Sequence, residues 1–135
     1  MNKRELEERL INFAVLIINI VEFMPDTKAA NHLSGQLLRS GTSPALNYGE
    51  AQSGESRKDF IHKIKIVLKE LRESHICMQI IYRTKLYKSE EKLSQALNEC
   101  NELISIFVKS VETAMKNDNE NRQNNLKSKI VNPCS

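Results

Sequence analysis

Apolar residues recur at steps of three and four along most of the chain, which is the spacing of one face of an α-helix. Short turns that contain Pro25, Gly54 or Ser89 interrupt this pattern. Capping residues precede the runs at Asn2, Thr27, Ser56 and Ser89. The four runs predict helices from about Lys3 to Met24, Thr27 to Gln52, Ser56 to Leu86, and Ser89 to Lys116. Long helices joined by short turns place sequential helices antiparallel. The pattern therefore predicts an all-α fold, a left-handed antiparallel up-down-up-down four-helix bundle over residues 1–116.

Two of these helices carry more apolar residues than one buried face requires. The first has a second stripe beside its main face, formed by Ile11, Val15 and Ile18. This stripe indicates either a deeply buried helix or a contact between subunits. The second half of the third helix is apolar nearly all round because four apolar residues lie off its heptad seam: Ile66, Ile76, Cys77 and Ile80. We expect that half to be buried on two sides.

The second helix contains a proline, and the end of the chain has no helical pattern. Pro44 removes one backbone donor, so we expect a kink there, with a break at Ser43 as the alternative. Gly41 and Ala45 are small enough for a neighbouring helix to approach closely. Residues 117–135 are polar, rich in Asn and aperiodic, which predicts a disordered tail.

Composition limits the environment that the chain suits. At 135 residues it corresponds to one domain, and its three cysteines form no CxxC motif, which favours a reducing compartment. The first residues lack the pattern of a signal peptide, and Asn12, Asn19 and Glu22 interrupt the longest apolar stretch. We therefore expect a cytoplasmic protein that does not insert into a membrane.

The positive charge of the chain is concentrated on the third helix. The formal net charge is +3, whereas residues 55–88 hold nine Lys or Arg and four Asp or Glu, a balance of +5. Helical spacing aligns five basic residues opposite the apolar seam, and we name them the basic stripe: Lys58, His62, Lys65, Lys69 and Arg72. The stripe is either a solvated outer face, with Lys69 and Glu73 as an i,i+4 ion pair, or a surface that contacts phosphates. It has no interleaved aromatic residues, so binding to nucleic acid would be largely independent of sequence.

A second set of polar residues lies on the second predicted helix, opposite its apolar face. We name it the polar stripe: Gln36, Arg39, Ser43, Asn47 and Glu50. It predicts a hydrogen-bond network within the fold or at an interface, or alternatively a ligand or catalytic site with a perturbed Glu50.

Motifs of enzymes and metal proteins do not occur in the sequence. Glu70 and Glu73 lack the Glu-x-x-His pattern of a di-iron bundle, and no phosphate-binding or dinucleotide-binding motif is present. We therefore predict a protein that is not an enzyme and has neither a metal nor a cofactor.

The segment from Arg39 into the third predicted helix resembles a known protein family. The pattern Arg39-Ser40-x-x-Ser43, Asn47-x-x-Glu50, Ser56-x-x-Asp59-Phe60 and the run KIKIVLKELRES resemble the bacterial proteins named after 23S rRNA intervening sequences. Weaker likeness covers about residues 5–115. The chain departs from the commoner family pattern at Ala51, where Gly is usual, and at Pro44, which falls one place earlier than in the commonest branch.

The resemblance implies a fold, an assembly and a class of partner. It implies an antiparallel four-helix bundle that assembles as a homopentamer, with a role that is not established. A ribosomal or RNA association has been supposed for the family from gene location, and bundles of similar fold bind nucleic acid as accessories to reverse transcriptases. Two hypotheses follow: an oligomer that binds RNA, DNA or a ribosome-associated partner, and a protein-interaction scaffold without nucleic acid.

Overall fold

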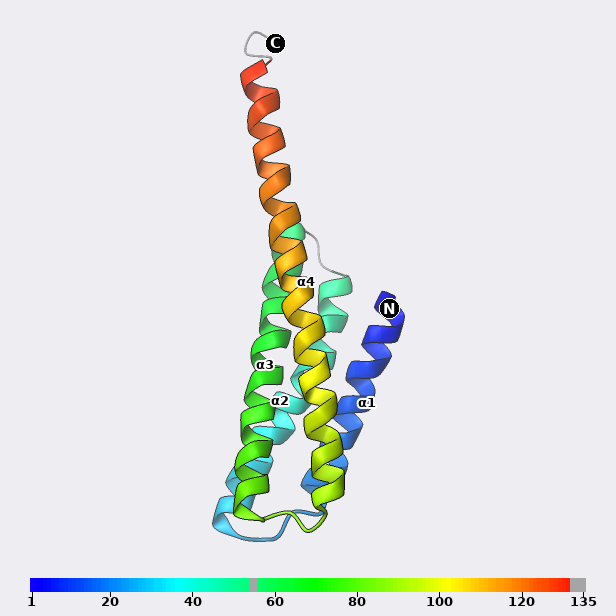
Figure 1. Ribbon diagram of the computed structural model, residues 1–135, viewed down its shortest axis with the longest axis vertical. Coiled ribbons are helices and arrows are strands. Elements are labelled where there is room, and N and C mark those ends of the chain that lie inside the picture. The colour runs from blue at the N-terminus through cyan, green and yellow to red at the C-terminus, as the bar shows by residue number, and fades with distance from the viewer. Residues whose placement is uncertain (54–55, 132–135) are drawn as a thin grey trace.

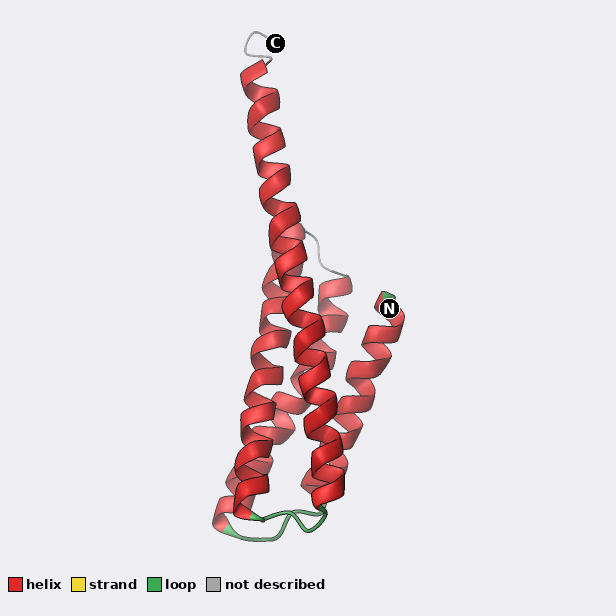
Figure 2. Cartoon of the chain, viewed as in Figure 1, coloured by secondary structure: helices red, strands yellow, loops and turns green. Residues whose placement is uncertain are grey.

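The computed structural model describes residues 1–53 and 56–131, which form four α-helices and no strand (Figures 1 and 2). The helices are α1 Lys3–Glu22, α2 Lys28–Gln52, α3 Arg57–Thr84 and α4 Glu90–Val131. Gly54 and Glu55 of the predicted turn after α2 lie outside the described residues, as do residues 132–135 with Cys134. Within the described residues, no helix is both long and apolar enough to cross a membrane.

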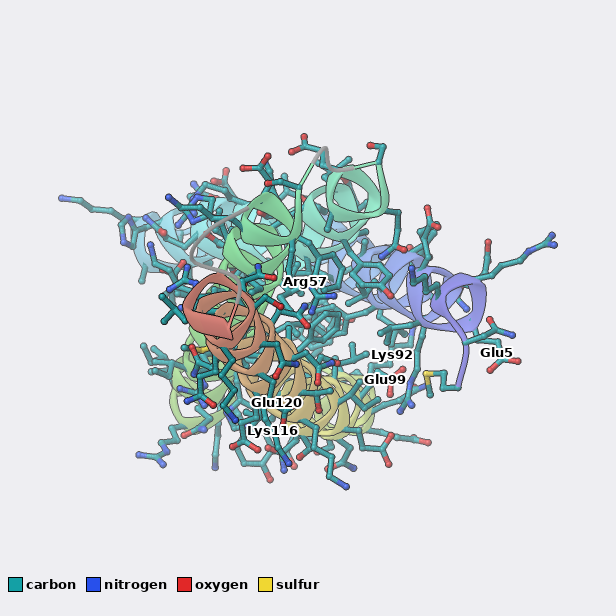
Figure 3. All side chains as sticks on the ribbon, turned by 90° about the horizontal axis from the view of Figure 1, so that it is seen from above. Glu5, Arg57, Lys92, Glu99, Lys116 and Glu120 are labelled. Carbon is teal, nitrogen blue, oxygen red and sulfur yellow. The ribbon has the colours of Figure 1, made fainter. Side chains whose placement is uncertain are left out.

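The helices run alternately down and up the long axis of the molecule (Figure 1). Contacts join α1 to α2, α2 to α3, α3 to α4, and α4 back to α1. A view along the bundle axis shows the helices following one another around it in chain order (Figure 3). The predicted antiparallel up-down-up-down four-helix bundle is therefore confirmed.

Side-chain caps begin the helices close to where the sequence predicts. Asn2 and Glu5 form a complete capping box at α1, while Thr27 and Ser56 accept the backbone N–H groups of Ala30 and Asp59. The first and third helices each end two residues before the predicted position. The early end of α3 follows from Lys85, which adopts a left-handed conformation with φ of 57°.

The core is a continuous layer of apolar side chains contributed by all four helices. Phe13 of α1 and Phe107 of α4 are fully buried, and Tyr48 of α2 meets the Phe107 ring edge to face with centroids 5.5 Å apart. Gly41 of α2 lies against Ile17 of α1, which confirms the close helix approach predicted there. The core therefore fixes the faces that α2 and α3 turn outward.

Pro44 lies inside α2, and the helix continues through it to Gln52. The alternative of a break at Ser43 is therefore wrong. The proline ring is buried, so apolar burial offsets part of the cost of the missing hydrogen bond to the carbonyl of Ser40.

Several apolar residues that were expected to be buried are exposed. Ile11, Val15 and Ile18 lie on the outer surface of α1, so the interpretation of α1 as a deeply buried helix is wrong for the single chain. Ile76 and Ile80 on α3 are 60% and 44% exposed, so burial of α3 on two sides is also wrong. The heptad seam identifies the face toward the core, and these residues lie on other faces.

The fourth helix is longer than its apolar pattern predicts. Residues 117–131 continue α4 beyond the bundle (Figure 1), where a disordered tail is expected from Asn117. This segment contains neither Gly nor Pro, and Arg122 pairs with Asp118 one helical turn earlier at 3.3 Å. Apolar periodicity reports where a helix packs, and the side chains of residues 119–128 are exposed to solvent, so the apolar pattern ends near Lys116 although the helix continues to Val131.

Candidate functional site

The basic stripe occupies the outer surface of α3. All five of its residues, Lys58, His62, Lys65, Lys69 and Arg72, are exposed. Ile64, Val67 and Leu71 on the opposite face are fully buried in the core. The periodicity therefore predicted the direction of this face correctly, and the structure leaves the whole stripe accessible.

The i,i+4 ion pair expected between Lys69 and Glu73 does not form. Glu73 lies instead beside Arg39 of α2, with 3.4 Å between Arg39 Nη2 and Glu73 Oε2. Among the described residues, none of the stripe's Lys and Arg side chains takes part in a salt bridge. The Lys and Arg side chains of the stripe are therefore not held in ion pairs within the described part of the chain.

The extension of α4 adds a basic residue beside the stripe. A groove of about 320 Å³ separates the first turns of α3 from this extension. Lys58, His62 and Lys65 line one wall of the groove, and Arg122 lies on the other with its partner Asp118. Sequence reasoning missed Arg122 because it assigned residues 117–135 to a disordered tail. The i,i+4 spacing of Asp118 and Arg122 was the available signal.

The polar stripe on α2 makes both bonds within the helix and contacts with α3. Arg39 donates to Gln36 at 3.0 Å on its own helix and pairs with Glu70 of α3 at 3.3 Å. The Asn47 amide donates to the carbonyl and hydroxyl oxygens of Ser43. These contacts match a hydrogen-bond network within the fold, one of the two interpretations of the stripe.

The C-terminal end of the polar stripe also contacts α3. Glu50 is exposed, and its Oε2 lies 2.5 Å from Nζ of Lys63 on α3. Arg39 and Glu50 are thus each bound to α3, at separate points along the helix pair. The structure does not bring them together at one reaction centre.

Glu70 is the buried carboxyl group beside this network. Burial raises the pKa of Glu70, the nearby Glu73 carboxylate raises it further, and the charge of Arg39 opposes both. Next to it, the buried Ser74 hydroxyl donates to Ser40 Oγ at 2.9 Å. Sequence reasoning considered Glu70, together with Glu73, for acid–base or metal chemistry. Within the described residues, no three His, Cys, Asp or Glu side chains are placed to hold a metal ion.

The two described cysteines are free thiols in the interior. Cys100 is fully buried and donates to the Leu71 carbonyl at 3.1 Å, and burial raises its pKa to about 12. Cys77 lies near the Leu33 carbonyl at 3.5 Å, and burial raises its pKa as well. Both behave as small core residues, as their positions in the apolar pattern predict.

Comparison with known proteins places this fold in a family. The family described as 23S rRNA-intervening sequence protein matches residues 3–130. The chain belongs to the 23S rRNA-intervening sequence protein family. The resemblance seen in the central segment is thereby confirmed over nearly the whole chain.

A solved member of a similarly named family shares the architecture. The crystal structure at 1.70 Å of a protein of unknown function from the S23 ribosomal protein family of Bacteroides thetaiotaomicron is 30% identical. The match covers 83% of this chain and 99% of that one, with a TM-score of 0.75. No curated protein shows significant similarity. Membership in the 23S rRNA-intervening sequence protein family thus establishes a fold and a lineage, and the role of the family is unknown.

Proposed function

We propose that the protein is a non-enzymatic, oligomeric four-helix-bundle protein that binds RNA or DNA through the basic stripe, without sequence specificity. The observation that carries the proposal is that the stripe is exposed and free of salt bridges within the described residues. Its five residues are exposed on one face, and its Lys and Arg side chains form no salt bridge within the described residues. Such a surface attracts phosphates by releasing their condensed counterions.

The geometry of the stripe suits contact with several phosphates. From Lys58 to Arg72 the helix rises about 21 Å, at 1.5 Å per residue. Arg122 lies across the groove from the start of the stripe, ion-paired with Asp118, and its guanidinium adds N–H donors for a phosphate without adding net charge. The stripe itself contains no Phe, Tyr or Trp side chain, which favours contacts to the backbone over reading of bases.

Assembly would multiply this surface. Ile11, Val15 and Ile18 expose an apolar strip on α1, and Ile76 and Ile80 expose another on α3. Apolar strips on a monomer are frequent sites of contact between subunits. Together with the resemblance described above, they support a homo-oligomer, with a homopentamer as the proposed form. Native mass spectrometry at micromolar concentration tests this: a monomer would remove assembly from the proposal.

The binding experiment compares two variants that change the net charge equally. Lys65→Glu/Lys69→Glu reverses two residues of the stripe. Lys28→Glu/Lys92→Glu reverses two exposed residues near the first turns of α2 and α4, at the other end of the bundle. Fluorescence anisotropy measures the affinity for labelled 20-nucleotide RNA and DNA between 50 and 200 mM salt.

The stripe variant should lose at least about tenfold in affinity at low salt, and its slope of log K against log salt should fall by about 2. The control variant should retain affinity within about threefold, because its charges lie far from the stripe. Equal losses in both variants would show that net charge alone governs binding. Absence of wild-type binding at 50 mM salt would refute nucleic-acid binding.

A protein-interaction scaffold without nucleic acid is the second candidate. The observation that favours it is a groove of about 350 Å³ between α2 and α3, which the exposed Ile76 and Ile80 line together with Leu33. The scaffold function would be supported if the wild-type protein forms an oligomer yet binds neither RNA nor DNA. Ile76→Glu/Ile80→Glu should then abolish the oligomer or the capture of a partner protein.

A further inference from the structure

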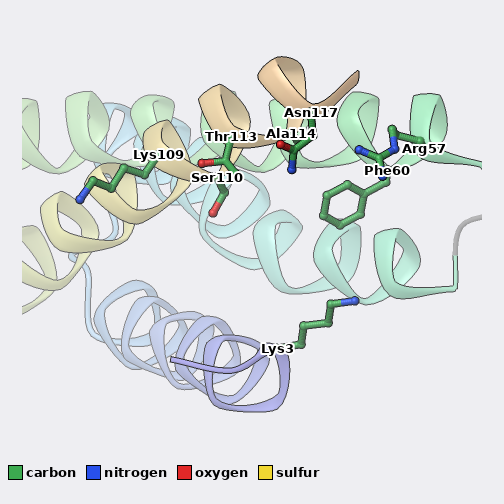
Figure 4. Close-up of a pocket in the computed structure, with 8 residues that line it drawn as sticks. All are labelled: Lys3, Arg57, Phe60, Lys109, Ser110, Thr113, Ala114 and Asn117. Atoms are coloured by element: carbon green, nitrogen blue, oxygen red, sulfur yellow. The ribbon is translucent and has the colours of Figure 1, made fainter. Parts of the chain in front are cut away.

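A third groove, larger than the one beside the basic stripe and the one between α2 and α3, lies at the end of the bundle that carries the N-terminus (Figure 4). It has a volume of about 580 Å³ and lies between α1, α3 and α4. Nearer the middle of the bundle, Arg9 binds Glu99 and Glu102 and holds α1 against α4. Toward its first residue α1 leans away from α4 (Figure 1), and the groove opens between them.

The charged residues that line this groove all have the same sign. Lys3 of α1, Arg57 of α3 and Lys109 of α4 line it, and its lining contains no carboxylate. None of the three cations forms a salt bridge with another described residue. Lys3 and Arg57 are also the first residues of their helices, so the positive ends of two helix dipoles add to the potential. The groove therefore suits an anionic occupant.

The rest of the lining supplies an apolar surface and hydrogen-bonding groups. Phe60 is half-buried, packs against the core, and directs its ring from α3 into the groove (Figure 4). Ala114 leaves space beside it, and the Thr113 hydroxyl and Asn117 amide are available from α4. An aromatic ring among cations and an amide is the set of groups that holds a nucleotide: a ring for the base and cations for the phosphate.

We propose that this groove binds one unstacked nucleotide of a single-stranded nucleic acid, with the base against Phe60 and the phosphates on either side of it near Arg57, Lys3 and Lys109. The inference rests on the proposed function. Arg57 directly precedes Lys58, the first residue of the basic stripe, so the groove and the stripe begin at the same end of α3. The bases of a duplex are stacked and paired, so only a single strand can place a base here.

The test separates the groove from the stripe by the form of the nucleic acid. Anisotropy compares a 12-nucleotide single-stranded RNA with a blunt hairpin duplex for wild type, Phe60→Leu and Phe60→Tyr. Phe60→Leu keeps an apolar side chain in the core and removes the ring, so single-strand affinity should fall about tenfold and duplex affinity should stay within twofold. Phe60→Tyr keeps an aromatic ring, so its single-strand affinity should stay close to that of wild type.

A second variant keeps the test valid if a change at Phe60 unfolds the bundle. Lys109 is exposed, so Lys109→Gln should fold normally, and it should weaken single-strand binding more than duplex binding; Lys92→Gln is the matched control. If Lys65→Glu/Lys69→Glu weakens both forms while the groove variants change neither, the proposed function stands and the nucleotide groove is wrong. If the wild type binds neither form, both proposals fail.

Competition with poly-L-glutamate distinguishes a nucleotide from a merely negative chain. Single-stranded RNA should resist displacement by poly-L-glutamate at equal charge concentration, because only the RNA offers a base to Phe60. If poly-L-glutamate displaces the RNA equally well, the groove recognises only negative charge and would also bind an acidic peptide. That result would overturn the assignment of a nucleotide.

Discussion

Gly41 on α2 and Ile17 on α1 touch with no space for a side chain between them. A Cβ atom placed on Gly41 would lie 2.7 Å from both Cγ1 and Cγ2 of Ile17, and Ile17 is fully buried. The nearest atoms belong to a branched core side chain that has little freedom to move. This contact sets how closely α1 and α2 approach.

Gly41→Ala should therefore destabilise the bundle. Overpacking costs about 1–3 kcal/mol, and the better helix propensity of Ala returns up to about 1 kcal/mol, so we expect a net loss of about 1–2 kcal/mol in the free energy of unfolding. Urea unfolding followed by circular dichroism measures it.

Gly35→Ala is the control for this change in the same helix. No atom lies within 4 Å of a Cβ at Gly35, so that variant should gain about 0.5–1 kcal/mol from helix propensity alone. A gain in both variants would show that α1 can move away from α2 without loss.

Glu70 should make stability depend on pH in the direction opposite to that of an ordinary ion-paired carboxylate. Its folded-state pKa is raised above the ordinary value of 4.5, chiefly by burial. Its contribution to stability is therefore fully present below pH 4.5 and is lost as the pH rises through the folded-state pKa. Glu70→Gln removes this dependence, so the variant should gain stability relative to wild type as the pH rises from about 4 to 7.

Urea unfolding at several pH values measures the difference between Glu70→Gln and wild type. Glu120→Gln, on the exposed extension of α4, makes the same change in formal charge away from the core and serves as the control. A Glu70→Gln variant that loses stability relative to wild type as the pH rises would show that the ion pair with Arg39 dominates over burial.

The buried thiols should be unreactive until the protein unfolds. In a Cys134→Ser background only Cys77 and Cys100 remain, and burial raises the pKa of both, to about 12 for Cys100. The thiolate is the reactive form, so Ellman's reagent at pH 8 should label neither rapidly in the native protein and both in 6 M urea. Cys77 should react before Cys100, since it is 8% exposed and Cys100 is fully buried. Rapid native labelling of Cys100 would indicate local opening of α4.

The sequence predicted those parts of the fold that depend on spacing and capping. Steps of three and four residues located the buried faces, and Asn2, Thr27 and Ser56 marked the beginnings of α1, α2 and α3. The same spacing placed the basic stripe opposite the core. These features are local, so a single sequence contains them.

Partners that come from another helix could not be predicted in this way. Glu73 has Lys69 as its neighbour along α3, yet it pairs with Arg39 of α2. The groove around Phe60 depends on how far α1 leans from α4, which reflects packing along whole helices. The helical extension of α4 escaped prediction because a solvated helix has no buried stripe.

That extension gives the last prediction. Deleting residues 117–135 should remove the helical signal of residues 117–131 while leaving the bundle intact, because the side chains of residues 119–128 are exposed. The free energy of unfolding should change by no more than about 0.5 kcal/mol. Ellipticity at 222 nm, expressed per molecule, measures the loss of helix, and urea unfolding measures the stability.

A pair of point variants tests the same helix in the full-length chain. Asn121→Pro should lower the ellipticity per molecule toward that of the truncated protein, because proline interrupts the helix of the extension, whereas Asn121→Ala should maintain or increase it. If the proline and alanine variants have the same ellipticity, and truncation removes no helical signal, then residues 117–131 are not helical in solution. In that case Arg122 no longer has a fixed position beside the basic stripe, and the binding surface is formed by α3 alone.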